Sequence, residues 1–290
     1  MKVFTLGRFT IVKEDTPTQF SGKVQRKPLE LLKAIISLGG IDVPEDRVTD
    51  LLWPDTEGDL AHQSFETTLH RLRRLLGNDM AIKHQGGQLT LDARYCWVDT
   101  WAFERLYEQI ESLFKSTREL ETERNVEILK PRTHNPNHVT RNPQPDTRNS
   151  KLEIQNSSIH NPQSAIIEAL RLTEKATGIY KGSFLPSDTG YLWSISARER
   201  LRNKFIRLMN MIGNYLERRG YWQQAMEHFQ MAVVIDDLVE EFYQHLMICY
   251  YTLGQKAEAV KVYNRCCTML SKVLGISPSQ KTEDIYHTLI

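Results

Sequence analysis

The sequence predicts a mainly α-helical protein with a small β part, and three observations support this prediction. Residues 59–77, DLAHQSFETTLHRLRRLLG, have the period of an amphipathic helix with a strongly polar outer face. Two short apolar runs around a glycine pair follow, which is typical of a β-hairpin. Beyond residue 164 the apolar residues follow a helical period throughout, and one pattern returns at a spacing of 34 residues.

The first part of the chain predicts strands and then two helices. Apolar and polar residues alternate over residues 2–12, which indicates strands at the edge of a small sheet. A helix follows, with Pro28 in its first turn and Gly39-Gly40 at its end. A second, short helix begins at Pro44, and Pro54 stops it.

The third helix, residues 59–76, has two contrasting faces. Its apolar face consists of Ala61, Phe65, Thr68, Leu69, Leu72, Leu75 and Leu76. The opposite face has Gln63, Thr67, His70 and Arg74 at its centre, Ser64 and Arg71 on one flank, and Glu66 and Arg73 on the other. Amide, hydroxyl, imidazole and guanidinium groups read base edges and bind phosphates in a major groove. This pattern predicts a recognition helix.

A hairpin completes the first domain. Residues 82–84 and 89–91 read as two short strands, with Gln85 to Gln88 at the tip. Three helices followed by a hairpin make a winged helix-turn-helix, to which we assign residues 1–98. Gln85 at the wing tip is a further candidate for DNA contact.

The middle of the chain changes in composition. Residues 99–114 have a helical pattern that includes Trp101, Leu106 and Ile110. Residues 115–163 are rich in Asn, Pro, Arg, Thr and Ser and lack apolar periodicity from Pro131 onward. We therefore expect a disordered linker or insertion over residues 115–163, because such a segment buries too little apolar surface to order itself.

Residues 164–290 predict an all-α domain of tetratricopeptide-like repeats. The triplet Gly220, Ala225 and Phe229 recurs as Gly254, Ala259 and Tyr263. Glycine permits the tight turn between paired helices, alanine permits their close approach, and the aromatic ring fills the groove between them. We expect a preceding helix pair from residues 99–114 and 164–181, and a capping helix over about residues 278–289.

Charge does not single out a nucleic-acid partner, since the net charge is +1. Residues 1–110 contain 14 basic and 16 acidic side chains, a net charge of −2. DNA binding therefore requires that Arg71, Arg73 and Arg74 be segregated from the acidic residues. A second basic stretch comprises Arg198, Arg200, Arg202, Lys204 and Arg207, for which we expect pairing within the chain, with DNA contact as the alternative.

Several protein classes lack support in the sequence. It has no phosphate-binding glycine loop, no nucleophile elbow and no metal-ligand spacing, so we expect no catalytic residue, metal site or cofactor. Its four cysteines fit free thiols. The N-terminus does not read as a signal peptide, and no apolar run is long enough to cross a membrane, so a cytoplasmic protein is expected.

Two sets of motifs together resemble a known family. VPEDRVTDLLWPD, TTLHRLRRLLG and VDTWAFERL resemble the winged-helix domain that response regulators share with SARP-type bacterial transcription activators. IYKGSFLP, Trp193 with ARERL, IDDLVEEFY, YYTLGQKAEAVKVYNR and VLGISPSQKT resemble the bacterial transcriptional activation domain (BTAD) that follows it in SARP proteins. The resemblance covers about 240 of the 290 residues.

The resemblance implies how the DNA-binding domain works. The third helix enters the major groove and the wing touches the minor groove. The resemblance assigns contacts with base edges to Gln63, Thr67 and His70, and contacts mainly with phosphate to Arg73 and Arg74. Arg71 serves either role. The sequence departs from the family at the wing, where Gly86-Gly87-Gln88-Leu89 has no aromatic residue, and in the insertion of nearly 50 residues.

The resemblance also implies partners. Residues Pro54 to Asp59 match the loop that contacts RNA polymerase, and related proteins bind direct DNA repeats as head-to-tail pairs, which implies a homodimer. RKPLELLKAIISLGG and RYCWVDTWAFERL are further similar to output modules of large ATPase-linked regulators, which implies a separate sensor or ATPase protein.

These observations yield two functional hypotheses. The first is a sequence-specific DNA-binding transcription regulator, an activator without catalysis of its own. The second is a protein-interaction or scaffold module in which the repeats bind a partner and the winged helix does not read DNA. The outward polar face of residues 59–76 favours the first, and the regional charge and the altered wing favour the second.

Overall fold

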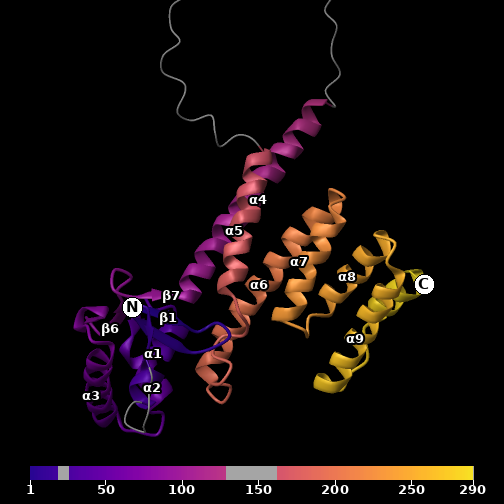
Figure 1. Ribbon diagram of the computed structural model, residues 1–290. Coiled ribbons are helices and arrows are strands. Elements are labelled where there is room, and N and C mark those ends of the chain that lie inside the picture. The colour runs from indigo at the N-terminus through magenta and orange to yellow at the C-terminus, as the bar shows by residue number, and fades with distance from the viewer. Residues whose placement is uncertain (19–25, 129–161, 290) are drawn as a thin grey trace, which may run out of the picture. The chain divides into compact units, whose positions relative to one another are not determined.

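The computed structural model describes residues 1–18, 26–128 and 162–289 (Figure 1). Its contacts divide the chain into two compact units, one of residues 1–105 with 176–290 and the other of residues 106–175. The first unit contains the winged helix and the helical repeats. The second contains the distal part of α4 (Asp99–Ile128) and most of α5 (Pro162–Ile179).

A four-stranded sheet opens the first unit. Its strands are β1 (Lys2–Phe4), β2 (Thr10–Lys13), β3 (Thr16–Pro17) and β7 (Trp97–Val98), in the order β3-β2-β1-β7. The predicted alternation is confirmed, because Val3 and Ile11 are opposite each other in the register and both are fully buried. The pairing of β1 with β7 is parallel and was not predicted. Two residues are too few to show a strand period.

The three predicted helices of the first domain are confirmed. They are α1 (Arg26–Ser37), α2 (Glu45–Leu52) and α3 (Gly58–Leu76). Helix α1 buries an apolar stripe, and the chain then turns through Gly39 and Gly40, both with positive φ. Gly77 ends α3 in the left-handed conformation that glycine adopts without strain.

The predicted hairpin is confirmed as a three-stranded sheet. Strands β5 (Ile82–Gln85) and β6 (Gln88–Leu91) pair antiparallel, and β4 (Val43–Pro44) pairs with β6. Gly86 and Gly87 have φ values of 59° and 71°, which the two-residue turn of type I′ requires. The short β4 was not predicted, and it ties the hairpin to the residues just before α2.

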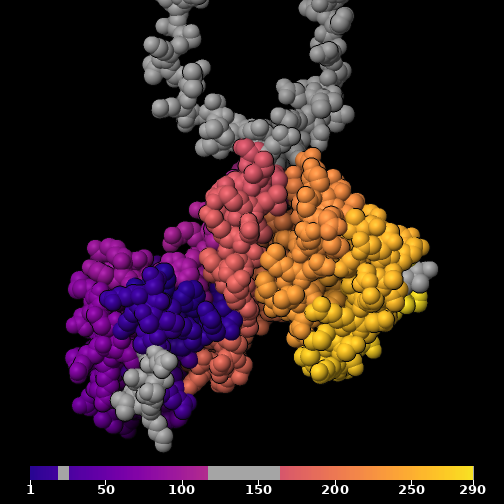
Figure 2. Space-filling model, viewed as in Figure 1, coloured from indigo at the N-terminus to yellow at the C-terminus, as the bar shows by residue number. Residues whose placement is uncertain are grey.

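Antiparallel helices form the rest of the first unit. They are α6 (Leu192–Arg218), α7 (Trp222–Ile235), α8 (Glu240–Thr252), α9 (Lys256–Leu274) and α10 (Gln280–Leu289). Each packs against the next, as the orange and yellow ribbons of Figure 1 show, and Figure 2 shows their side chains as a continuous body.

The repeat prediction is confirmed at the turns and in the packing. Gly220 and Gly254 have positive φ, and Ala225, Phe229 and Ala259 are buried. Tyr263 stacks on Tyr286 of α10, with ring centroids 3.8 Å apart. Helix α10 packs against both α8 and α9, as expected of a capping helix.

One predicted boundary is corrected. Helix α4 continues to Ile128, so the segment expected to be linker from residue 115 starts as helix. Residues 115–128, KSTRELETERNVEI, contain strong helix formers and neither proline nor glycine. Helix propensity without an apolar stripe leaves no apolar periodicity in the sequence, which is why the pattern did not reveal this part of the helix. Residues 129–161 of the expected linker lie outside the described residues.

The winged-helix and repeat parts of the first unit are joined by backbone pairing. The Gly7 amide donates to the Ser183 carbonyl at 2.9 Å, and the Leu185 amide donates to the Thr5 carbonyl at 2.8 Å. Lys33 of α1 forms an ion pair with Asp188, with its Nζ 2.8 Å from both carboxylate oxygens. These contacts place residues 182–191 against the first sheet and α1. No helix among the described residues has the length and apolarity to cross a membrane.

Candidate nucleic-acid interface

The buried face of α3 fixes the rotation of the helix about its axis. Phe65, Leu69 and Leu72 are fully buried, and Ala61, Thr68 and Leu76 are nearly so. The expected apolar face is therefore confirmed, with Leu75 only half-buried. Because this face is held by the packing of α1 against α3, the opposite face must point outward.

The outward face presents the predicted polar residues together. Gln63, Thr67, His70, Arg71 and Arg74 are all exposed. Gln63, Thr67, His70 and Arg74 are spaced three or four residues apart and form one stripe along the helix. Ser64 is half-buried beside this stripe. The stripe offers hydrogen-bond donors and acceptors on a rigid element, as base recognition requires.

Arg73 has a role that the sequence did not reveal. Its Nε and Nη2 atoms donate to the carbonyl oxygen of Ile82, at 3.2 Å and 2.9 Å. The side chain is half-buried and fastens α3 to the first residue of the wing strand β5. Arg73 thus differs from the exposed Arg74, although the two are neighbours in sequence.

The wing is held against the beginning of α2. The Glu45 amide donates to the carbonyl of Gly87 at 2.8 Å, so the turn is bound to the helix start. Gln85 and Gln88 pair across the turn, and both are exposed. The predicted wing residue Gln85 is therefore placed where a nucleic acid could reach it.

Cations gather at the carboxyl end of α3. Lys13 donates from Nζ to the carbonyl of Leu75 at 2.6 Å, which caps the negative end of the helix dipole. Arg71 and Arg74 are exposed nearby, and no side chain in the described part of the chain forms an ion pair with either. Both guanidinium groups are therefore available to phosphates.

Acidic side chains of this domain are partly neutralised by neighbours. Asp92 pairs with Lys83 at 3.0 Å and with Arg94 at 2.6 Å. The hydrogen bonds from Arg94 hold the pKa of Asp92 well below its usual range. Glu30 is bound by Arg26 and Lys27. Each of these two clusters carries a net charge of +1, so the rest of residues 1–110 carries a net charge of −4. DNA binding therefore depends on where the other acidic side chains lie.

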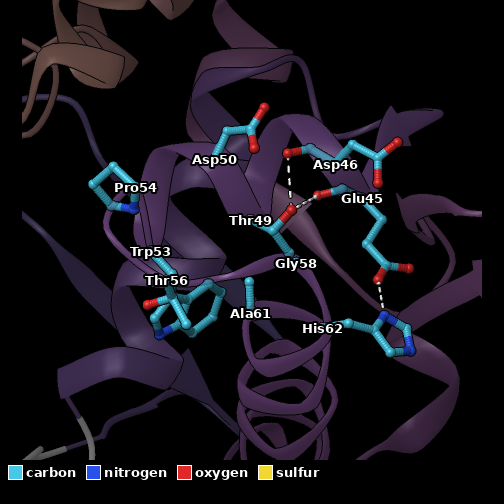
Figure 3. Close-up of a pocket in the computed structure, with 10 residues that line it drawn as sticks. All are labelled: Glu45, Asp46, Thr49, Asp50, Trp53, Pro54, Thr56, Gly58, Ala61 and His62. Carbon is cyan, nitrogen blue, oxygen red and sulfur yellow. Dashed lines mark hydrogen bonds and ion pairs between the residues drawn. The ribbon is translucent and has the colours of Figure 1, made fainter.

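Five of the other acids lie on α2 and the loop after it, namely Glu45, Asp46, Asp50, Asp55 and Glu57. A cavity of about 280 Å³ between α2, this loop and the start of α3 is shown in Figure 3. It is lined by Glu45, Asp46, Thr49, Asp50, Trp53, Pro54, Thr56, Gly58, Ala61 and His62. The acidic side of the domain is thus centred on α2, whereas Arg71 and Arg74 lie in the last turns of α3. This is the local segregation that the DNA hypothesis requires.

A cluster of two glutamates and two histidines connects α2, α3 and β5. His62 Nδ1 lies 2.5 Å from Oε1 of Glu45, and His84 Nε2 lies 2.7 Å from its Oε2. His84 Nδ1 is 3.4 Å from Oε1 of Glu66. The hydrogen bond to Glu45 raises the pKa of His62. Sequence reasoning missed this cluster because its members come from three elements. The only local signal was the spacing of four residues between His62 and Glu66.

The second basic stretch pairs within the chain, as expected. Arg200 and Lys204 both contact Glu104, at 3.3 Å and 2.8 Å. Arg202 contacts Asp236 at 2.7 Å. These cations stabilise the helical part and leave the exposed end of α3 as the stronger candidate for a phosphate-binding surface.

Comparisons with known proteins agree with this architecture. Residues 151–290 match the family model of the bacterial transcriptional activator domain. The fold is similar to the structure of Mycobacterium tuberculosis EmbR in complex with a low-affinity phosphopeptide, with a TM-score of 0.60 and 14% sequence identity. The match covers 99% of this chain and 64% of EmbR, so the chain spans less than two thirds of that protein. No curated protein matched the chain.

Proposed function

We propose that this chain, a SARP-type transcriptional regulator that contains a bacterial transcriptional activator domain, binds double-stranded DNA sequence-specifically and activates transcription. Members of this family are transcriptional regulators and not enzymes. The observation that supports DNA binding most directly is the exposed polar stripe of α3, on a helix fixed in rotation by its buried face. A regulator of this kind acts where the bacterial chromosome lies, in the cytoplasm.

The residues of α3 divide into two roles in this proposal. Gln63, Thr67 and His70 face base edges in the major groove, with Ser64 beside them, because amide, hydroxyl and imidazole groups match the donors and acceptors there. Arg71 and Arg74 contact phosphates, which set the register of the protein on the duplex. Gln85 at the wing tip reaches the neighbouring minor groove.

In this proposal Arg73 positions the wing, whereas its neighbour Arg74 contacts phosphate. The Nε and Nη2 atoms of Arg73 already donate to the Ile82 carbonyl. It holds the wing at a fixed distance from α3, and its effect on DNA binding is therefore indirect.

Partners follow from the family and from the charge pattern. We propose that the loop from Pro54 to Asp59, with the exposed acids Asp55, Glu57 and Asp59, contacts a basic surface of RNA polymerase. We further propose that the helical repeats support a homodimer, which binds direct repeats in the DNA. EmbR was solved with a phosphopeptide, and a separate sensor protein is the corresponding proposal here.

The alternative function is a protein-interaction module whose winged helix does not read DNA. The net charge of −2 over residues 1–110 and the short turn of Gly86 and Gly87 favour it. The two functions differ in salt dependence. If several phosphates are contacted, duplex affinity falls steeply and log-linearly with salt concentration, whereas a protein partner need not show this slope.

The deciding experiment is a selection from random duplexes with the full chain in moderate salt. We expect one enriched motif, and we expect Arg71→Ala/Arg74→Ala to lose it while circular dichroism stays unchanged. Arg171→Ala, a control in the exposed pair of Arg171 and Glu168, should select the same motif as the unaltered chain.

Single substitutions then separate base readout from phosphate contact. Gln63→Ala or His70→Ala should relax preference at individual base pairs by about 1–3 kcal/mol. Arg74→Ala should weaken all duplexes alike. Absence of any enriched motif with the intact chain would favour the interaction module, and equal sequence-blind losses from all three variants would refute the assignment of base contacts.

A further inference from the structure

The cluster of Glu45, His62, Glu66 and His84 has the composition and spacing of a metal site. Donor atoms of Glu45, Glu66 and His84 all lie within 4.8 Å of one another. Glu45 directs one oxygen to His62 and the other to His84. Figure 3 shows the His62 ring facing the Glu45 carboxylate at the edge of the cavity.

Burial makes the charge of this cluster significant. The Glu45 side chain is 11% exposed and that of His84 is 18% exposed. A buried carboxylate is costly unless a cation neutralises it. In the described part of the chain, neither Glu45 nor Glu66 pairs with a lysine or arginine, and their ion pairs there are with histidine. With neutral imidazoles the four side chains carry a net charge of −2, which a divalent cation would cancel.

Neighbouring contacts orient the imidazole rings. Phe65 contacts both rings, edge-on to His84 with centroids 5.4 Å apart and roughly parallel to His62 at 6.5 Å. Because Phe65 is fully buried, the position of the His84 ring is fixed by the core. The His62 ring is 60% exposed and can rotate about its side-chain bonds without disturbing the core.

We propose that Glu45, His62 and His84 bind one divalent transition-metal ion, with zinc as the best fit. Two imidazole nitrogens and one carboxylate are a common zinc ligand set, and water fills the fourth position. The ion takes the place of the direct contacts between the carboxylate and the imidazoles. Tetrahedral ligands at zinc lie about 3.3 Å apart. The present separations of 2.5 Å and 2.7 Å must therefore open slightly. His62 lies outside the three residues whose donor atoms are within 4.8 Å of one another, so its exposed ring must also turn toward the ion.

Glu66 is a positioning residue in this site. Once Nε2 of His84 binds the metal, its Nδ1–H can donate to Glu66, whose Oε1 lies 3.4 Å away. A carboxylate behind a ligating histidine fixes the ring and its tautomer. The ion would join α2, α3 and β5, the elements that set the wing beside the recognition helix.

The test measures zinc binding by the full chain after treatment with a chelator. Titration of zinc chloride against a chromophoric competitor should give one ion per chain, and cobalt(II) should give the visible absorption of a four-coordinate site. Glu45→Gln and His84→Gln should weaken binding at least 100-fold. His62→Ala, at an exposed position, should weaken it at least 10-fold without unfolding the chain. Glu66→Gln should weaken it about 10- to 100-fold.

Matched controls distinguish this site from surface binding. Asp46→Asn removes an exposed carboxylate next to Glu45, and His287→Ala removes an exposed imidazole on α10. Both should leave zinc affinity unchanged. A stoichiometry below one, or unchanged affinity in both His62→Ala and Glu66→Gln, would overturn the proposal. Neither result would affect the DNA-binding proposal, because this measurement contains no DNA.

Discussion

At the scale of single residues, the neighbours Arg73 and Arg74 show how one helix directs one cation to another element and the next to solvent. Arg74 is exposed and without an ion pair among the described residues, whereas Arg73 donates two hydrogen bonds to the Ile82 carbonyl. The helical period separates them by about 100°. Neighbours of identical chemistry therefore meet different surroundings, one facing outward and the other facing the wing.

Alanine variants of the two arginines should differ in their free energy of unfolding. Arg73→Ala leaves the Ile82 carbonyl without its donors, and we expect the free energy of unfolding to fall by about 2 kcal/mol. Arg74→Ala should leave it unchanged and weaken duplex binding. Denaturant unfolding monitored by circular dichroism, beside duplex titrations at one salt concentration, checks both. Equal stability of the two variants would contradict the positioning role of Arg73.

The sequence predicted which face of α3 is exposed, but not which residues at the edges of that face contact other elements. The positions of Gln63, Thr67, His70 and Arg74 follow from helical period alone, since a face opposite an apolar stripe must be exposed. Arg73, Glu66 and His84 find their partners on other elements. Such partners depend on tertiary packing, which one sequence without a fold cannot specify.

At the scale of elements, two helical glycines, Gly213 of α6 and Gly178 of α5, differ in the space around them. A Cβ atom at Gly213 would lie 2.1 Å from the ring of the buried Phe229 on α7, whereas one at Gly178 would meet nothing within 4 Å. Gly213 thus allows α6 and α7 to approach closely around Phe229.

Alanine at these two positions should change the free energy of unfolding in opposite directions. Gly178→Ala should raise the free energy of unfolding by up to about 1 kcal/mol, because alanine favours the helix more than glycine does. Gly213→Ala should lower it by about 2 kcal/mol, because the same preference is outweighed by overpacking against Phe229. Chemical denaturation of both variants checks the signs, and stabilisation by Gly213→Ala would show that α6 and α7 are not packed as described.

Elements with strong boundary residues were predictable, and the others were not. Gly77, Pro54 and the Gly86-Gly87 turn mark ends that local backbone chemistry enforces, and the structure has them there. The short strands β4 and β7 exist because of pairing partners distant in sequence. The extension of α4 to Ile128 follows a stretch of strong helix formers without apolar periodicity, which an apolar pattern cannot reveal.

At the scale of the whole molecule, the winged helix and the repeats share one compact unit. Glu30 of α1 is linked to Tyr191, just before α6, by a hydrogen bond from the phenol. Burial opposes ionisation of Glu30, but the bonds from Tyr191, Arg26 and Lys27 outweigh it and lower its pKa. Helix α1 also packs against α3, so it contacts both the segment before α6 and the helix with the exposed polar face.

The ion pair of Lys33 and Asp188 tests this connection. Its side chains are only 14% and 10% exposed, so Asp188→Ala leaves a largely buried ammonium without its partner. We expect the free energy of unfolding to fall by about 3 kcal/mol, and Lys33→Met/Asp188→Leu to recover most of this loss. Lys261→Ala, in the exposed pair with Glu258, serves as the control and should change nothing measurable. Urea unfolding followed by tryptophan fluorescence gives these differences. An unchanged midpoint for Asp188→Ala would mean that residues 182–191 do not contact α1 in solution.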